Sequence, residues 1–115
     1  VPFAGCYASD LPRAQQTAQE LASTLPALGT FVLDGRIRER DVGRRQGMPL
    51  GEFKRNLDSY DDVESTHALR ERAMGFLLER AADQEGSILL VVTHGGVIRS
   101  LFRHSGKQVR NGGVY

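Results

Sequence analysis

The fold is decided by residues 88–99, which read Ile-Leu-Leu-Val-Val-Thr-His-Gly-Gly-Val-Ile-Arg. The first five of these residues are apolar and three are β-branched, which is typical of a short strand buried on both faces of a parallel sheet. Apolar residues resume after Gly96 with helical spacing, so the pattern predicts a strand, a turn and a helix. His94 therefore follows the carboxyl end of a buried strand. Ligands bind at that edge in open α/β sheets, and helix N-termini attract anions.

The same stretch also fits a plain strand–turn–helix connection. In that interpretation His94 caps the helix and the two glycines supply only turn geometry. Two glycines after a strand are a weak motif, and only the rest of the chain separates the two interpretations.

Length and composition limit the class of protein. A chain of 115 residues predicts one domain, 1–115, with a modest core. The formal net charge of +1 argues against nucleic-acid or membrane binding through a basic surface. Cys6 is the single cysteine, which excludes an internal disulfide and favours the cytoplasm. Because the chain starts at Val1 and ends at Tyr115, both in strand-like runs, we expect it to be part of a longer protein.

Strands and helices alternate along the chain. Residues 3–8 and 30–33 fit short strands, and residues 11–25 fit an amphipathic helix with Pro12 in its first turn and Ser9 or Asp10 as its cap. A second helix begins after Ser65 or Thr66. A short helix is expected around residues 50–57, and a last strand at residues 114–115. The alternation predicts an α/β domain whose mainly parallel sheet is flanked by helices.

Three polar side chains follow the three main predicted strands. Arg13 follows the first strand, Glu39 the second and His94 the third, so a parallel sheet brings them to one edge. Together they can bind a phosphate, protonate a leaving oxygen and stabilise developing charge. No metal site is expected, because His67 and His104 lie in predicted helices without ligand spacing.

The motifs around these residues resemble the histidine phosphatase superfamily, the phosphoglycerate-mutase-like proteins. Four segments match in order: Ser-Asp-Leu-Pro-Arg-Ala-Gln-Gln-Thr-Ala (9–18), Arg-Ile-Arg-Glu-Arg-Asp-Val-Gly with Gln-Gly (36–47), Glu64-Ser65 with Arg72, and Thr-His-Gly-Gly (93–96). Val63 stands where the family usually has glycine. Residues 37–40, 99–102 and 111–112 look closest to the TIGAR-type fructose-2,6-bisphosphatases.

The resemblance implies specific roles without any metal or other cofactor. Arg13 would clamp the transferring phosphoryl group, Glu39 would protonate the leaving group and His94 would stabilise the transition state. A backbone N–H near Gly95 would help to hold the phosphate. The reaction would be hydrolysis of a small phosphorylated substrate through a phosphohistidine.

One family feature is absent from the sequence. The nucleophilic histidine of the family lies in an Arg-His-Gly motif at the end of the family's first strand, which would precede Val1. We expect that strand to lie between the strands at residues 3–8 and 88–92. Three hypotheses remain open: a phosphomonoesterase or mutase completed by that segment, a short form that binds anions without turnover, and an α/β interaction domain in which the three residues never meet. The sequence does not define the oligomeric state.

Overall fold

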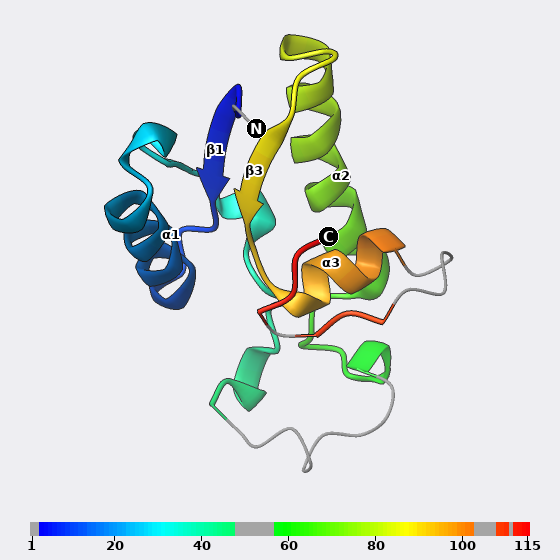
Figure 1. Ribbon diagram of the computed structural model, residues 1–115. Helices are drawn as coiled ribbons and strands as arrows, with labels where there is room; N and C mark the ends of the chain where they lie inside the picture. The colour runs from blue at the N-terminus through cyan, green and yellow to red at the C-terminus, as the bar shows by residue number, and fades with distance from the viewer. Residues whose placement is uncertain (1–2, 48–56, 103–107, 111) are drawn as a thin grey trace.

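The computed structural model describes residues 3–47, 57–102, 108–110 and 112–115 (Figure 1). It contains one three-stranded parallel sheet made of β1 (Gly5–Ala8), β2 (Val32–Leu33) and β3 (Leu89–Val92), in the order β2-β1-β3. Helices flank this sheet, which confirms the predicted α/β class. Residues 114–115 do not form a strand, so that prediction was wrong. Most of the short helix expected at residues 50–57 lies outside the described residues.

The pairing of β1 with β3 corrects one expectation about the sheet. All four residues of β1 pair with β3 in parallel register, from Gly5 opposite Leu89 to Ala8 opposite Val92. The hydrogen bond from Ser9 N to Val92 O, at 2.9 Å, extends this ladder by one residue. Because each strand uses the facing edge for these bonds, no further strand fits between them. The expectation that the family's first strand lies between β1 and β3 was therefore wrong.

One face of the sheet is covered by α1 (Pro12–Thr24). Ala14 and Ala18 are its buried residues, and such small side chains allow the helix to lie close to the strands. Pro12 is in the first turn as predicted, but the cap differs from the prediction. Leu11 is the N-cap residue and no side chain caps the helix. Ser9 lies fully buried instead.

The other face packs on α2 (Thr66–Asp83) and the short α3 (Gly95–Phe102) lies against α2 (Figure 1). Ser65 caps α2 as predicted, because its Oγ accepts a hydrogen bond from Ala68 N at 3.0 Å. Phe76 is fully buried and meets the Tyr7 ring edge-on, with 5.5 Å between ring centroids. A second buried cluster joins α2 to α3 and consists of Leu69, Ala73 and Val97. This packing anchors the helix that follows His94.

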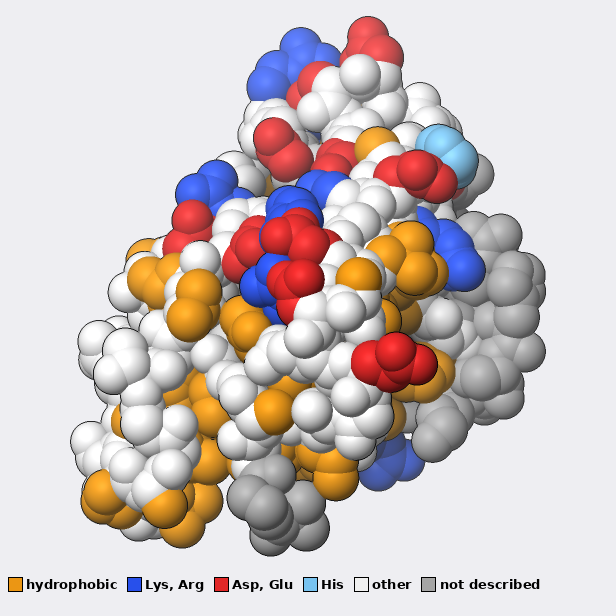
Figure 2. All heavy atoms as spheres, turned by 90° about the horizontal axis from the view of Figure 1, so that it is seen from above, with side chains coloured by type: hydrophobic (Ala, Val, Ile, Leu, Met, Phe, Trp, Pro, Cys, Tyr) orange, Lys and Arg blue, Asp and Glu red, His pale blue; other side chains and the backbone are white. Residues whose placement is uncertain are grey.

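Charges of both signs lie on the surface together with exposed apolar side chains such as Leu78 and Ile88. Figure 2 shows acidic and basic side chains interleaved on the face seen from above. Within the described ranges, no helix has both the length and the apolar character that a membrane span requires. Cys6 is buried, and its thiol lies 3.5 Å from the Leu28 carbonyl oxygen.

Candidate active site

The carboxyl ends of the strands define one edge of the sheet, and polar residues follow each end. Ser9 follows β1, Asp34 follows β2, and Thr93 and His94 follow β3. Parallel strands place these segments side by side. This edge is where ligands bind in open α/β folds.

His94 is nearly enclosed by protein at this edge. The residue is only 6% exposed, and its Nε2 lies 2.8 Å from Ser9 Oγ. Ser9 Oγ also accepts a hydrogen bond from Leu11 N at 3.2 Å, so the start of α1 fixes the hydroxyl that orients the imidazole. In the described part of the chain, Nδ1 makes no such bond.

Burial lowers the pKa of His94 below its usual value of 6.5. The Glu39 carboxylate opposes this shift, whereas the positive charges of Arg13 and Arg72 reinforce it. All three charges therefore influence the protonation of the imidazole. Of the residues that the sequence placed after strand ends, Glu39 contacts the helix that follows His94, whereas Arg13 is linked to His94 by its charge alone among the described interactions.

Glu39 approaches the first turn of α3 from the loop that follows Ile37. Its Oε2 accepts a hydrogen bond from Gly96 N at 3.2 Å, and its Oε1 accepts one from Arg40 N at 2.9 Å. A Cβ on residue 96 would collide with this carboxylate. The second glycine of Thr-His-Gly-Gly thus leaves the space in which Glu39 lies, and a negative charge is favourable at a helix N-terminus.

The arginines on either side of Glu39 are paired with other groups. Arg38 forms an ion pair with Asp10, with Nε 2.5 Å from Oδ1. Arg40 bonds to Asp58 at 3.1 Å and to Thr66 Oγ1 at 2.9 Å. The charge run at residues 36–41 is thus more than a solvated loop, because its charges are divided among separate partners.

Arg13 lies exposed in the first turn of α1, where no acidic residue accompanies it. Its guanidinium makes no hydrogen bond or ion pair with the residues that the structure describes. The Arg99 side chain folds back over the start of α3, with Nη1 3.0 Å from the position that a Cβ on Gly95 would take. Arg99 was not among the residues predicted to form the site, although its spacing of four residues from Gly95 puts both on one helix face.

A cleft of about 450 Å³ opens beside Glu39. It is lined by Gly35, Val63 and charged side chains from residues 38–41, from residues 61–64 and from α2: Arg38, Glu39, Asp41, Asp61, Asp62, Glu64 and Arg72. In the described ranges, no group of three His, Cys, Asp or Glu side chains is arranged to hold a metal ion. The cleft offers paired charges and no metal cage.

Of the other two histidines, the structure describes only His67. His67 lies exposed on the first turn of α2 rather than at a strand end. His104 lies outside the described residues.

Comparison with known proteins agrees with this architecture. A family model for the histidine phosphatase superfamily (branch 1) matches residues 1–111. The chain is 34% identical to phosphoglycerate mutase-like protein 4 of Arabidopsis thaliana, over 90% of this chain and 51% of that protein. It is 32% identical to a metal-independent phosphoserine phosphatase of the same plant, over 84% of this chain and 46% of that protein. The chain thus belongs to the histidine phosphatase superfamily.

Solved structures share the fold. Phosphoglycerate mutase from Bacillus anthracis str. Sterne superposes with a TM-score of 0.71 at 20% identity, and the match covers 94% of this chain and 63% of that one. The chain spans about half the length of the curated relatives it matches.

Proposed function

We propose that this chain supplies most of the active site of a metal-independent phosphomonoesterase that acts through a phosphohistidine. The observation that carries the proposal is the placement of the Glu39 carboxylate against Gly96 N, at the start of the helix that follows the buried His94, whose pKa the Arg13 charge lowers. A carboxyl group, an imidazole and a guanidinium at one sheet edge supply proton transfer and charge stabilisation.

The nucleophile comes from the family resemblance. A histidine in an Arg-His-Gly segment ahead of Val1 would attack phosphorus and form an N–P bond while the ester P–O bond breaks. Glu39 would give its proton to the leaving alkoxide, and Arg13 and His94 would hold the equatorial phosphoryl oxygens. Water would then attack the phosphohistidine and give its proton to Glu39. This hydrolysis would break the N–P bond, release phosphate and regenerate the histidine.

The proposed substrate is a small phosphorylated metabolite, a sugar phosphate or bisphosphate, as the short matches to TIGAR-type fructose-2,6-bisphosphatases suggest. We propose no nucleic-acid or membrane partner and a cytoplasmic location. Phosphotransfer of the mutase kind is the alternative chemistry, in which the phosphohistidine passes its phosphoryl group to a second hydroxyl rather than to water.

A second candidate function is anion binding without turnover. It is favoured by the position of His67, which is exposed in the first turn of α2 and does not follow a strand. In this case Arg13 and His94 would bind phosphate, and no group of the 115-residue chain would attack it.

The test compares two forms of the protein, the 115-residue chain and one extended through an Arg-His-Gly segment ahead of Val1. We expect p-nitrophenyl phosphate turnover only from the extended form, with loss of turnover when its added histidine becomes Ala. Inorganic phosphate should bind both forms, as followed by NMR shifts of His94. Turnover by the short chain that disappears with His94→Ala would contradict the proposal, because His94 would then be the nucleophile. Phosphate binding without turnover in either form would favour the second candidate.

A further inference from the structure

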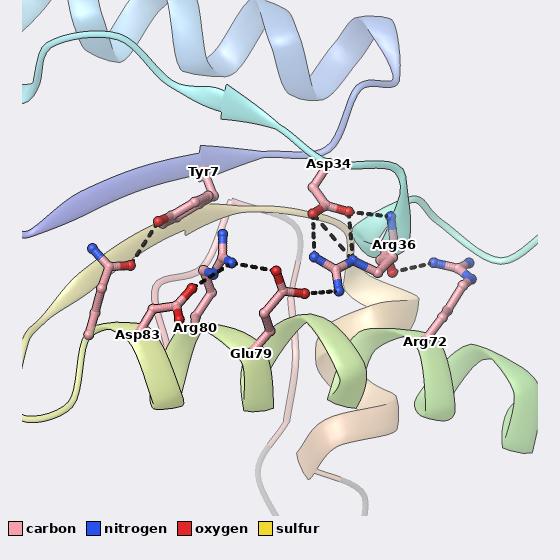
Figure 3. A network of polar contacts seen from close by, with 8 residues as sticks. Tyr7, Asp34, Arg36, Arg72, Glu79, Arg80 and Asp83 are labelled. Carbon is pink, nitrogen blue, oxygen red and sulfur yellow. Dashed lines mark hydrogen bonds and ion pairs between the residues drawn. The ribbon is translucent and has the colours of Figure 1, made fainter.

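The backbone carbonyl oxygens of residues 36–39 all accept hydrogen bonds from side chains that are distant in sequence. Arg72 Nη1 donates to the oxygens of Arg36 and Arg38, both at 2.8 Å, and Nη2 donates to that of Glu39 at 3.1 Å. Thr93 Oγ1 donates to the Ile37 oxygen at 2.7 Å. Figure 3 shows Arg72 reaching the Arg36 carbonyl from α2.

Arg72 is itself held by Glu64. Its Nε and Nη2 donate to the two carboxylate oxygens of Glu64 at 2.7 and 2.8 Å, the bidentate geometry that fixes a guanidinium most firmly. The two side chains are 23% and 17% exposed. Arg72 holds the pKa of Glu64 below its usual range, so this carboxyl stays charged and the pair stays intact at neutral pH.

Glu64 also holds the loop beyond Glu39. Its backbone N–H donates to the Asp41 oxygen at 2.8 Å, and its Oε1 accepts from Asp41 N at 3.1 Å. The pair of Arg72 and Glu64 therefore contacts the chain on both sides of Glu39.

This arrangement replaces regular secondary structure. The 3-10 helix η2 (Gly35–Ile37) ends just before Glu39, and no helix or strand includes residues 38–42. Carbonyls that are shielded from water need other hydrogen-bond donors, and a planar guanidinium can donate to several of them at once in a fixed geometry. The backbone position of Glu39 is thus set by a side chain of α2.

We propose that Arg72, oriented by Glu64, is a positioning residue that holds the Glu39 carboxyl in the place from which it protonates the leaving group. The inference rests on the proposed function for the role of Glu39. Arg72 itself touches neither the reacting atoms nor the substrate in this role. A purely structural Arg72 would stabilise the fold without any particular effect on proton donation.

The kinetic test uses Arg72→Lys in the N-terminally extended form. Lysine keeps the positive charge but lacks the planar guanidinium that donates to several oxygens at once. With an alkyl phosphate we expect kcat to fall about 10²-fold, the loss that a displacement of about 1 Å can cause. With p-nitrophenyl phosphate, whose leaving group needs little protonation, the loss should be much smaller. In a Glu39→Gln background, Arg72→Lys should cause no further loss on the alkyl phosphate, because both changes remove the same step.

Arg44→Lys is the matched control. Arg44 is largely exposed, pairs with Asp62 and contacts none of the four carbonyls, so both substrates should be turned over at the parent rate. Glu64→Gln gives a second, milder perturbation with the same substrate preference. Equal losses on both substrates in Arg72→Lys and Glu64→Gln, or losses that multiply with those of Glu39→Gln, would overturn the proposal.

A second measurement does not depend on turnover and separates this inference from the proposed function. The amides of Arg40 and Gly96 both donate to the Glu39 carboxylate, so their hydrogen exchange reports whether Glu39 is held. Arg72→Lys should lose protection at both amides while Ala68, which bonds to Ser65, keeps it. Unchanged protection at Arg40 and Gly96 would refute the positioning role even if Glu39 proves to be the acid. Lost protection together with no substrate preference in Glu39→Gln would instead refute the acid assignment.

Discussion

The Glu39 carboxylate accepts a hydrogen bond from Gly96 N at 3.2 Å, across 57 residues of sequence. This contact joins the loop after β2 to the first turn of α3, next to His94. The charge run at residues 36–41 and the Thr-His-Gly-Gly turn are therefore parts of one site.

Glu39→Gln should reduce turnover in a way that depends on the leaving group. General acid catalysis contributes about 10²–10⁴-fold, so in the extended form kcat with an alkyl phosphate should fall by roughly that factor. The loss with p-nitrophenyl phosphate should be much smaller. Glu20→Gln, at an exposed position of α1, is the control and should leave both rates unchanged. Equal losses on both substrates would show that Glu39 does not act as the acid.

Gly96→Ala should displace the Glu39 carboxylate without unfolding the protein. The added Cβ would meet the end of a side chain rather than backbone, so the free energy of unfolding should change by less than about 1 kcal/mol. Turnover of an alkyl phosphate should nevertheless fall about 10²-fold, as for a displacement of about 1 Å.

Gly75→Ala is the matched control for that prediction. Gly75 also lies in a helix, and a Cβ there would meet nothing within 4 Å. It should stabilise the protein by about 0.5–1 kcal/mol in chemical denaturation and leave kcat unchanged. A Gly96→Ala variant as active as Gly75→Ala would mean that Glu39 works from another position.

Removal of the Ser9 hydroxyl should destabilise the protein and disturb His94. Ser9 is fully buried, and its Oγ bonds to both His94 Nε2 and Leu11 N. Ser9→Ala leaves these groups without that partner, which typically costs about 1–3 kcal/mol. Ser23→Ala, at an exposed position of α1, should change the free energy of unfolding by less than about 0.5 kcal/mol. Urea denaturation measures both, and similar values for the two variants would contradict the buried contact.

His94 should make the protein less stable in mild acid. Burial lowers its pKa in the folded chain below 6.5, so the unfolded chain binds the proton more tightly. The free energy of unfolding therefore falls as the pH drops through about 6.5 toward the lower folded value. The pH dependence of His94→Gln, measured by urea denaturation at intervals from pH 8 to 5, should lack this component. Parallel curves for parent and variant would contradict the lowered pKa.

Much of this architecture follows from local patterns in the sequence. The apolar run before Thr93 identified β3, helical spacing identified α1 and α3, and residue type limited the cap of α2 to Ser65 or Thr66. These features depend on interactions between residues close in the chain, which a linear pattern records. The rule that parallel strands end at one edge led to the prediction that Arg13, Glu39 and His94 lie near one another.

Only the tertiary structure decided which strands are neighbours and what holds each side chain. The order β2-β1-β3 differs from the expected insertion of a strand between β1 and β3, because strand order depends on packing between distant segments. Ser9 has the residue type of a helix cap, yet its hydroxyl is buried against His94, 85 residues away. Arg72 donates hydrogen bonds to carbonyl oxygens that lie more than 30 residues earlier in the chain. No periodicity records such contacts, since a guanidinium or a hydroxyl bonds to whatever acceptor the folded chain brings within reach.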